Sequence, residues 1–285
     1  MTVVRQATQD DLDLIFPLFK GFATHSQVDP EDWKKIFGKL WDRQDSCCGY
    51  VLMDGKEAVG FLGTIFSQRL IKGIPRDFCN LTSWIVKPDY RSESLSLLFP
   101  LMGRKDLTLT NFTASNRVIE VLLKVGFHSL EDHFQMILPI PLPAIGFKVH
   151  FDAEIIENTL HGDNLRIFLD HKKLHCEHIL LEFQNDQCYL VLNPARKRNL
   201  PVMYVDYISN LGFFMKYIQR YTFSICRKLQ VFGLMTGEHN LRGSRFALAL
   251  RIKRRHALLY RSKDVSPENI DTLYSEIQVL GLKPV

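Results

Sequence analysis

The segment from Val86 to Ser96 (VKPDYRSESLS) joins the apolar run NLTSWIV to the apolar run LLFPL. A turn of this kind between a strand and a helix can direct several backbone N–H groups at one anion. Ser94 and Ser96 are small enough to let the backbone approach a phosphate, and each adds a hydroxyl. Arg91 can bind two phosphate oxygens at once. The pattern indicates phosphate binding, and an ordinary helix capped by Ser92 or Ser94 is the alternative.

The same segment resembles the acetyl-CoA pyrophosphate loop of the GCN5-related N-acetyltransferase (GNAT) superfamily, whose pattern is V-x-P-x-x-[QR]-x-x-G-x-[GA]. Val86, Pro88 and Arg91 match this pattern, and Ser94 and Ser96 stand where the family has small glycine-type residues. The resemblance implies that main-chain amides in this loop hold the pyrophosphate of an acyl-CoA donor.

Two further features extend the resemblance over residues 1–138. The run ASNRVIEVLLKVGF is similar to the family's N-x-x-A-x-x-x-Y-x-x-x-G-F region, and VRQATQDDLDLIFPLF is similar to its first strand and helix. The end of the strand DLTLTNF would then lie beside the donor, although Thr113 or Ser115 capping a helix is the competing interpretation. The residues expected to contact acetyl-CoA or another acyl-CoA are Val86, Arg91, Ser92, Glu93, Ser94, Leu95, Ser96, Asn111, Ser115 and Asn116.

Acyl transfer from a thioester to an amine needs a group that accepts the amine proton and a donor for the carbonyl oxygen. Asp77 and Ser83, beside Asn80 and Trp84 at the strand before the loop, are the catalytic candidates, with a surface turn as the alternative for Asp77. Many family members have a tyrosine before the Gly-Phe pair that protonates the leaving thiolate. Leu122 occupies that position here and cannot donate a proton.

The elements around these residues alternate between helical and strand patterns. The first half indicates a strand, helices over residues 8–22 and 29–43, a hairpin around Asp54-Gly55 and a strand over 80–86. A helix over 94–102, a strand over 106–112, a helix over 114–127 closed by Gly126 and a strand over 133–140 follow.

The second half indicates a similar order of hairpin, strand, helix and strand, closed by a helix over 266–281 with Ser266 as its cap. Its strand-to-helix junction carries Phe213 and Phe214, which would fill a phosphate site. We therefore expect an α/β (α+β) chain of two GNAT-like domains, each a mixed central sheet flanked by helices. The expected boundaries are 1–138 for the donor-binding domain, 139–147 for a proline-rich linker and 148–285 for a degenerate second domain.

The charge is uneven between the halves. The first 140 residues carry 16 basic and 17 acidic residues and the remainder 20 and 14. The clusters Arg196-Lys197-Arg198 and Lys253-Arg254-Arg255 suggest an anionic partner, and an exposed loop is the alternative. His171, His175, Cys176 and His178 have some metal-like spacing, but they lead into a strand, so no metal site is expected.

The six cysteines show no paired framework, and no secretory signal or membrane helix is visible, which favours a cytoplasmic chain. The expected function is transfer of an acyl group, most simply acetyl, from acyl-CoA to a small-molecule or polymer-linked amine. Two alternatives stay open. One is a transferase that uses acyl carrier protein or aminoacyl-tRNA as donor, and the other is a non-catalytic acyl-CoA-binding module.

Overall fold

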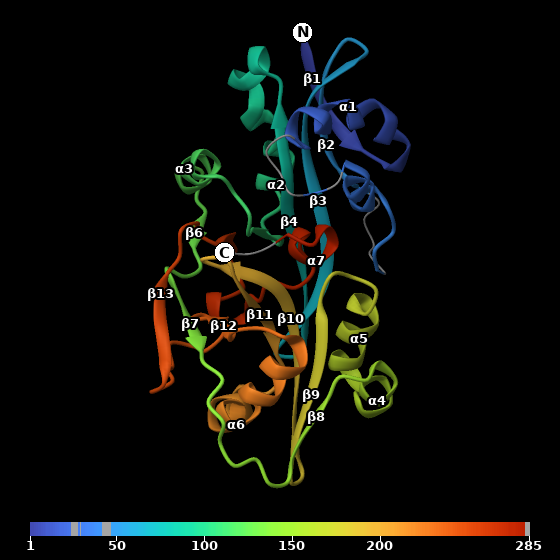
Figure 1. Ribbon diagram of the computed structural model, residues 1–285. Coiled ribbons are helices and arrows are strands. Elements are labelled where there is room, and N and C mark those ends of the chain that lie inside the picture. The colour runs from blue at the N-terminus through green and yellow to red at the C-terminus, as the bar shows by residue number, and fades with distance from the viewer. Residues whose placement is uncertain (24–27, 29, 42–46, 283–285) are drawn as a thin grey trace. The chain divides into compact units, whose positions relative to one another are not determined.

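The computed structural model describes residues 1–23, 28, 30–41 and 47–282 (Figure 1). The described chain divides into two compact units. The first comprises residues 1–128, 259–265 and 274–282, and the second comprises residues 129–258 and 266–273. In this part of the chain each unit is built around a seven-stranded sheet of mixed strand direction with helices against it, which is the fold class expected from the sequence.

The sheet of the first unit has the strand order β1-β2-β3-β4-β5-β14-β6. Its strands are β1 (Thr2–Ala7), β2 (Gly49–Asp54), β3 (Glu57–Ile71), β4 (Ile74–Val86), β5 (Thr108–Asn111), β6 (His128–Ser129) and β14 (Leu259–Arg261). Its helical segments are the 3-10 helices η1 (Gln9–Asp11), η2 (Pro30–Phe37) and η3 (Pro88–Leu97), and the α-helices α1 (Leu12–Ala23), α2 (Phe99–Met102), α3 (Asn116–Lys124) and α7 (Glu276–Leu280).

The sheet of the second unit has the strand order β13-β7-β12-β11-β10-β9-β8. Its strands are β7 (His133–Ile137), β8 (Phe147–His150), β9 (Glu177–Phe183), β10 (Asp186–Lys197), β11 (Leu200–Ile208), β12 (Leu234–Gly237) and β13 (Ala249–Lys253). Its helical segments are α4 (Ala153–Thr159), α5 (Gly162–His171), α6 (Leu211–Leu229) and the 3-10 helix η4 (Pro267–Asn269).

The expected architectural repeat is present. In the first unit β1 to β4 pair antiparallel in succession and β5 then lies parallel to β4. In the second unit β8 to β11 do the same and β12 lies parallel to β11.

The strands that complete each sheet come from the other half of the sequence. β7, expected at the end of the first domain, pairs with β12 and β13 in the second sheet, and the late strand β14 pairs with β5 in the first. The units therefore differ from the expected boundaries at 138 and 148, because the second unit starts at Ser129 and two late segments belong to the first. Each of these strands hydrogen-bonds with the backbone of a strand edge that would otherwise be unpaired. The sequence of the strand itself does not indicate such a distant partner.

Three expected helices differ in the structure. The segment expected as a helix over 29–43 is the 3-10 helix η2, and residues 29, 42 and 43 lie outside the described residues. The helix expected over 94–102 is divided between the end of η3 and the short α2. The helix expected over 266–281 is two short pieces, because Tyr274 has a positive φ of 57° and Ser275 caps a new helix through a bond from the Ile277 N–H.

One face of the first sheet is covered by α1 and η2. The Phe19 ring stacks on the Trp33 ring with centroids 5.1 Å apart and meets the Phe61 ring edge-on. α7 contacts η2, and Tyr274, just before α7, meets Trp41 edge-on at 4.9 Å. The C-terminal segment of the described chain is thus part of the first unit's core.

In the second unit α6 packs against the sheet through Phe214, Ile218 and Ile225. No helix in the described ranges combines the length and the apolar character needed to cross a membrane.

Candidate active site in the first unit

The pairing between the two parallel strands of the first sheet is short. Residues 78–80 of β4 pair with residues 108–110 of β5, and β4 then continues to Val86 while β5 ends at Asn111. Beyond Asn80, no strand among the described residues pairs with the edge of β4 that faced β5, and Leu81, Thr82 and Ser83 at its start are buried. An open strand edge of this kind offers backbone N–H and C=O groups to an extended ligand.

A bulge bends β4 within this unpaired stretch. The register with β3 passes from Gly63↔Thr82 to Phe61↔Ile85, which leaves Ser83 and Trp84 opposite a single residue. Ser83 has a positive φ of 52°, and its hydroxyl lies 3.2 Å from that of Thr82. A bulge re-aims the side chains around it, and Trp84 has its Nε1 buried with no hydrogen-bond partner among the described residues.

A carboxylate lies at the end of this parallel pair. Asn80 donates from Nδ2 to the Thr110 hydroxyl over 3.2 Å, and its Oδ1 accepts the backbone N–H of Glu276 at 3.3 Å. Thr113, just beyond the end of β5, donates its hydroxyl to Glu276 Oε1 over 2.6 Å. Glu276 itself begins α7, after the Ser275 cap.

Glu276 is fully buried, and its second oxygen, Oε2, has no hydrogen-bond partner in the described part of the chain. Burial raises the pKa of Glu276 to about 7, although the bonds from Thr113 and from nearby backbone oppose the rise. A carboxyl group with a pKa near neutrality and a free oxygen can both accept and return a proton.

The loop expected to hold the pyrophosphate follows the open edge of β4. Arg91 and Ser92 are exposed, whereas Glu93, Ser94, Leu95 and Ser96 are half-buried. These residues form the 3-10 helix η3, in which the Ser96 hydroxyl donates to the Glu93 carbonyl at 2.6 Å. The Glu93 carboxylate accepts a hydrogen bond from the Thr2 hydroxyl. The segment is thus a 3-10 helix, where the start of a regular α-helix was expected.

The remaining predicted residues fall at both ends of the parallel pair. Asp77 precedes the paired residues and accepts a bond from Gln68 Nε2 at 3.2 Å, so it lies on the other side of the pair from Ser83 and the open edge. Val86 closes β4.

On β5, Asn111 is buried with Oδ1 unpartnered among the described residues. Ser115 is the N-cap residue of α3 without a side-chain capping bond, and the exposed Asn116 follows it. Leu122, in the position where the family has tyrosine, is fully buried.

Glu276 is the functional candidate that sequence reasoning missed. The run YSEIQVL reads as part of an amphipathic helix, in which a glutamate would be placed on the solvent face. The one local signal is the capping pair Ser275 and Gln278, which marks a new helix start at this point.

In the second unit, the chain itself contacts the end of the parallel pair β11 and β12. β11 pairs with β12 over residues 203–205 and 234–236, and the Asn240 side chain donates to the Val205 carbonyl at 3.2 Å. The first turn of α6 contains the buried rings of Phe213 and Phe214.

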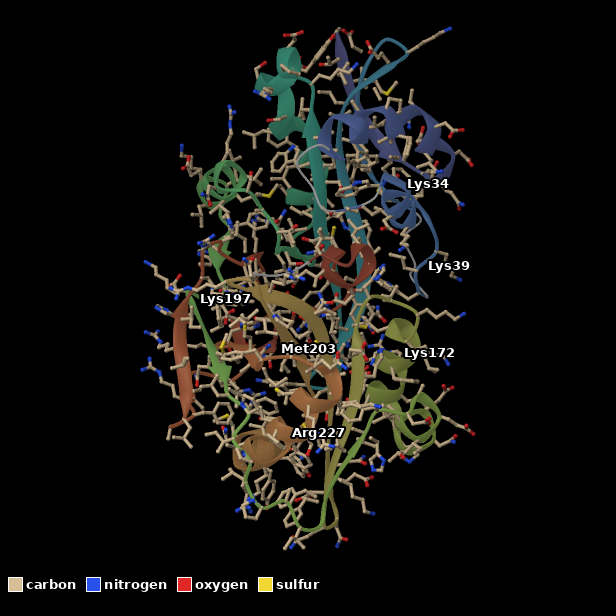
Figure 2. The ribbon with its side chains drawn as sticks, viewed as in Figure 1. Lys34, Lys39, Lys172, Lys197, Met203 and Arg227 are labelled. Atoms are coloured by element: carbon tan, nitrogen blue, oxygen red, sulfur yellow. The ribbon has the colours of Figure 1, made fainter. Side chains whose placement is uncertain are left out.

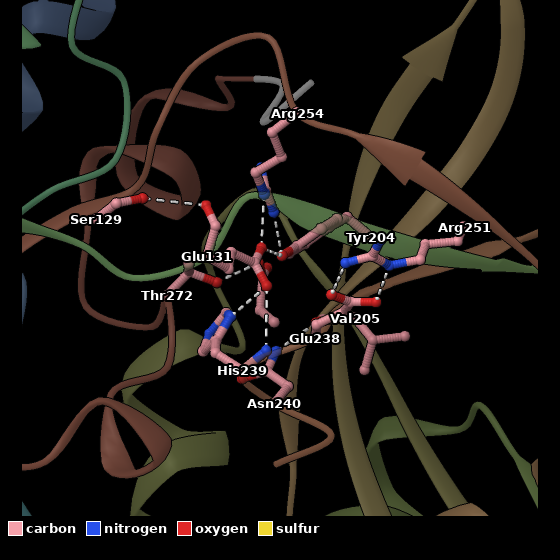
Figure 3. A network of polar contacts seen from close by, with 11 residues as sticks. Ser129, Glu131, Tyr204, Val205, Glu238, His239, Asn240, Arg251, Arg254 and Thr272 are labelled. Atoms are coloured by element: carbon pink, nitrogen blue, oxygen red, sulfur yellow. Dashed lines mark hydrogen bonds and ion pairs between the residues drawn. The ribbon is translucent and has the colours of Figure 1, made fainter. Parts of the chain in front are cut away.

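A buried polar network stands beside this point (Figure 3). Glu131 accepts hydrogen bonds from Arg254 Nε at 2.5 Å and from the Tyr204 hydroxyl at 3.3 Å, and His239 Nδ1 lies 2.7 Å from its other oxygen. Burial alone would raise the pKa of Glu131, but the charges of His239 and Arg254 and the bonds from His239 lower it to about 2.

The histidine and cysteine cluster of the second unit forms neutral pairs. His178 Nδ1 lies 2.7 Å from the Tyr189 hydroxyl, and its Nε2 lies 3.6 Å from Cys176 Sγ. Burial lowers the pKa of His178 to about 4 and raises that of Cys176. No group of three His, Cys, Asp or Glu side chains in the described ranges is placed to hold a metal ion, and all six cysteines are free of disulfides.

No protein-family model and no curated protein sequence matches the chain. Solved structures do. A GCN5-related N-acetyltransferase from Anabaena variabilis aligns over 92% of this chain and 72% of its own, with a TM-score of 0.57 and 11% identity. A probable N-acyltransferase from Enterococcus faecalis aligns over 92% and 73%, with a TM-score of 0.57 and 8% identity.

A GCN5-related N-acetyltransferase from Kribbella flavida aligns over 92% of this chain and 71% of its own, with a TM-score of 0.56 and 11% identity. Because the identities are this low, the alignments show only that the elements are arranged alike. The chemistry has to be argued from the residues of the site. The chain has the fold of the GCN5-related N-acetyltransferase structures.

Proposed function

We propose that the protein is an acyltransferase that moves an acyl group, most simply acetyl, from acyl-CoA to an amine at the end of the parallel pair β4 and β5. The observation that carries the proposal is Glu276, a buried carboxyl with one unpartnered oxygen at the point where β4 loses its neighbour. The fold shared with N-acetyltransferase structures supports the same reaction class.

The residues at the gap fit an acyl-CoA donor. Both strands that border the gap carry a buried polar atom without a partner among the described residues, Trp84 Nε1 on β4 and Asn111 Oδ1 on β5. The open edge of β4 can pair with the amide groups of an extended pantetheine arm. Arg91 is exposed beyond that edge, with no ion pair to a described carboxylate, and can bind the pyrophosphate.

In the proposed reaction the amine nitrogen attacks the thioester carbonyl, an N–C bond forms and the C–S bond breaks. Glu276 Oε2 accepts the proton that the amine loses. Leu122 cannot protonate the leaving sulfur, so the proton held by Glu276 is the one available to return to it. The sum is amine plus thioester giving amide plus thiol. In this proposal Glu276, and not Asp77, is the base.

The test combines binding with turnover. Acetyl-CoA is titrated calorimetrically into the wild type and into Glu276→Gln, and thiol release is followed with a panel of amines. The proposal expects equal acetyl-CoA affinity in both proteins and turnover that is about 100-fold slower or more in Glu276→Gln. Turnover near the wild-type rate in Glu276→Gln would reject Glu276 as the base, and absence of acetyl-CoA binding would reject acetyl-CoA as the donor.

A second candidate function is a non-catalytic acyl-CoA-binding module. It is favoured by Leu122 in place of the usual proton donor and by the 3-10 conformation of η3, which uses backbone amides internally. Acetyl-CoA binding without turnover on any amine would support this module. The same titration with acyl carrier protein or aminoacyl-tRNA as ligand tests the other donors.

A further inference from the structure

Two basic segments that are far apart in the sequence meet in the second unit. Lys197 ends β10, and Arg198 begins the turn to β11, where Arg198 and Asn199 have positive φ values of 46° and 67°. Arg254 and Arg255 directly follow β13. We call Lys197, Arg198, Arg254 and Arg255 the basic cluster.

One aromatic ring shows how close the two segments come. Lys197 Nζ lies 4.9 Å from the centre of the Phe134 ring, and the guanidinium carbon of Arg254 lies 5.6 Å from the same centre. Burial lowers the pKa of Lys197, and the positive charges of Arg255, Arg198 and Arg254 lower it further. The three arginines are therefore near enough to act electrostatically on Lys197. Figure 2 labels Lys197 on this part of the second unit.

Two of the carboxylates near the basic cluster are paired with arginines. Glu131 is buried and paired with Arg254. Glu238 pairs with Arg251 at 2.7 Å and with Arg245 at 3.7 Å, and Asp132 acts electrostatically on Arg251. Lys197, Arg198 and Arg255 have no ion pair with a carboxylate in the described ranges. The three exposed or half-exposed cations thus keep an uncompensated charge.

Two members of the basic cluster are held in place by contacts. Arg254 is anchored by Glu131 and Tyr204 beneath the surface, and Lys197 lies on the Phe134 ring. The tight turn at Arg198 and Asn199 fixes the end of the β10–β11 hairpin. Cations held close together without counter-charges lose little entropy on binding an anion with several charges, and guanidinium groups match phosphate in particular.

We propose that the basic cluster is a binding site for the phosphate groups of a polyanionic ligand, either the backbone of single-stranded RNA or a free polyphosphate. The proposal is independent of acyl transfer in the first unit. It assigns a ligand class to the charge excess of the second half of the sequence, which the acyltransferase proposal does not use.

The test uses the full chain, a fluorescein-labelled single-stranded RNA of about 16 nucleotides, and inorganic tripolyphosphate. RNA affinity is measured by anisotropy at several potassium chloride concentrations for the wild type and for the triple variant Lys197→Gln, Arg198→Gln, Arg255→Gln. Arg254 is left intact because it belongs to the buried network. The matched control is Lys148→Gln, Lys173→Gln, Arg227→Gln, which removes three exposed cations of the same unit.

The basic-cluster variant should weaken RNA binding and reduce the slope of log affinity against log salt by about 2, since each lost phosphate contact on a single strand removes about 0.7. The control should keep the wild-type slope. If tripolyphosphate displaces the labelled RNA at equal phosphate concentration, free polyphosphate is the favoured ligand. If only unlabelled RNA displaces it, RNA is the favoured ligand. Both results support the site.

Three results would overturn the proposal. The first is an equal loss of affinity in the control variant. The second is the absence of both RNA and tripolyphosphate binding in the wild type, the latter measured by calorimetry. The third is displacement of RNA by polyglutamate more readily than by tripolyphosphate at equal charge, which would assign the surface to an acidic protein.

Discussion

The hydroxyl of Thr113 donates a 2.6 Å hydrogen bond to Oε1 of Glu276, a residue 163 positions later in the chain. Thr113 is an exposed residue, whereas Glu276 is fully buried. The bond therefore ties the buried carboxyl to the loop after β5. The other oxygen remains without a partner in the described part of the chain, which is the arrangement a proton acceptor needs.

Glu276 should make stability fall as the pH rises through neutrality. Its pKa is about 7 in the folded chain against an ordinary 4.5, so between these values the folded state binds more protons than the unfolded state. The unfolding free energy of the wild type should then drop, relative to Glu276→Gln, by about 2–3 kcal/mol between about pH 5 and about pH 8. Urea unfolding at both pH values measures this difference. Glu120→Gln, an exposed change on α3, should keep the wild-type change of unfolding free energy with pH. If Glu276→Gln also keeps that change, the result would contradict the pKa of Glu276.

Acyl transfer should follow the ionisation of the same group. The base must be deprotonated, so kcat/KM should rise with pH and level off above about pH 7. Glu276→Gln should lower kcat about 100-fold or more and remove this rise of kcat/KM with pH, which we call the step in the pH profile. Acetyl-CoA affinity should be retained. Thr113→Val removes one bond that lowers the pKa of Glu276, so it should move the step to higher pH. A step that remains in Glu276→Gln would assign the titration to another group.

The elements that could be predicted are those whose signals are local. Asp54-Gly55 predicts the turn between β2 and β3, and Gly55 has the positive φ of 59° that this turn needs. The parallel order of β4 and β5 follows from a helical segment between two strands. The turn at Lys72-Gly73 between β3 and β4 was not predicted, although both residues have positive φ.

The features that could not be predicted depend on distant contacts. β7 and β14 are short strands of five and three residues, and nothing in either segment indicates which strand it will pair with. Glu276 has no local sign of burial, because its surroundings come from Asn80 and Thr113. Arg91 to Ser96 were singled out by the resemblance of their spacing, and the 3-10 conformation of this segment was not predicted.

The Glu131 network should stabilise the second unit most where Glu131 is ionised (Figure 3). Its folded pKa of about 2 lies below the ordinary 4.5, so the stabilisation is present above 4.5 and is lost as the pH falls towards 2. Glu131→Gln leaves Arg254 buried without its counter-charge and should cost about 3–5 kcal/mol of unfolding free energy near neutrality.

The double variant Glu131→Gln, Arg254→Met removes both charges and should cost less than the sum of the two single changes. Chemical denaturation of the four proteins measures the coupling. Simple additivity would mean that the Arg254–Glu131 ion pair contributes no coupled stability. His239→Asn can keep a donor toward Glu131 while removing Nε2, and it should cost less than Glu131→Gln.

Donor binding should depend on the loop after β4. Arg91→Ala removes the exposed cation placed beyond the open edge, and it should weaken acetyl-CoA binding about tenfold, the loss of roughly 1.4 kcal/mol expected for one charge-assisted contact. Ser94→Phe should weaken it as well, because a large ring prevents close approach of the phosphate to the backbone. The control is Arg117→Ala, which removes another exposed arginine, on α3 of the same unit. Calorimetric titration of acetyl-CoA into the three variants compares them directly, and equal losses in Arg91→Ala and Arg117→Ala would remove the loop from the donor site.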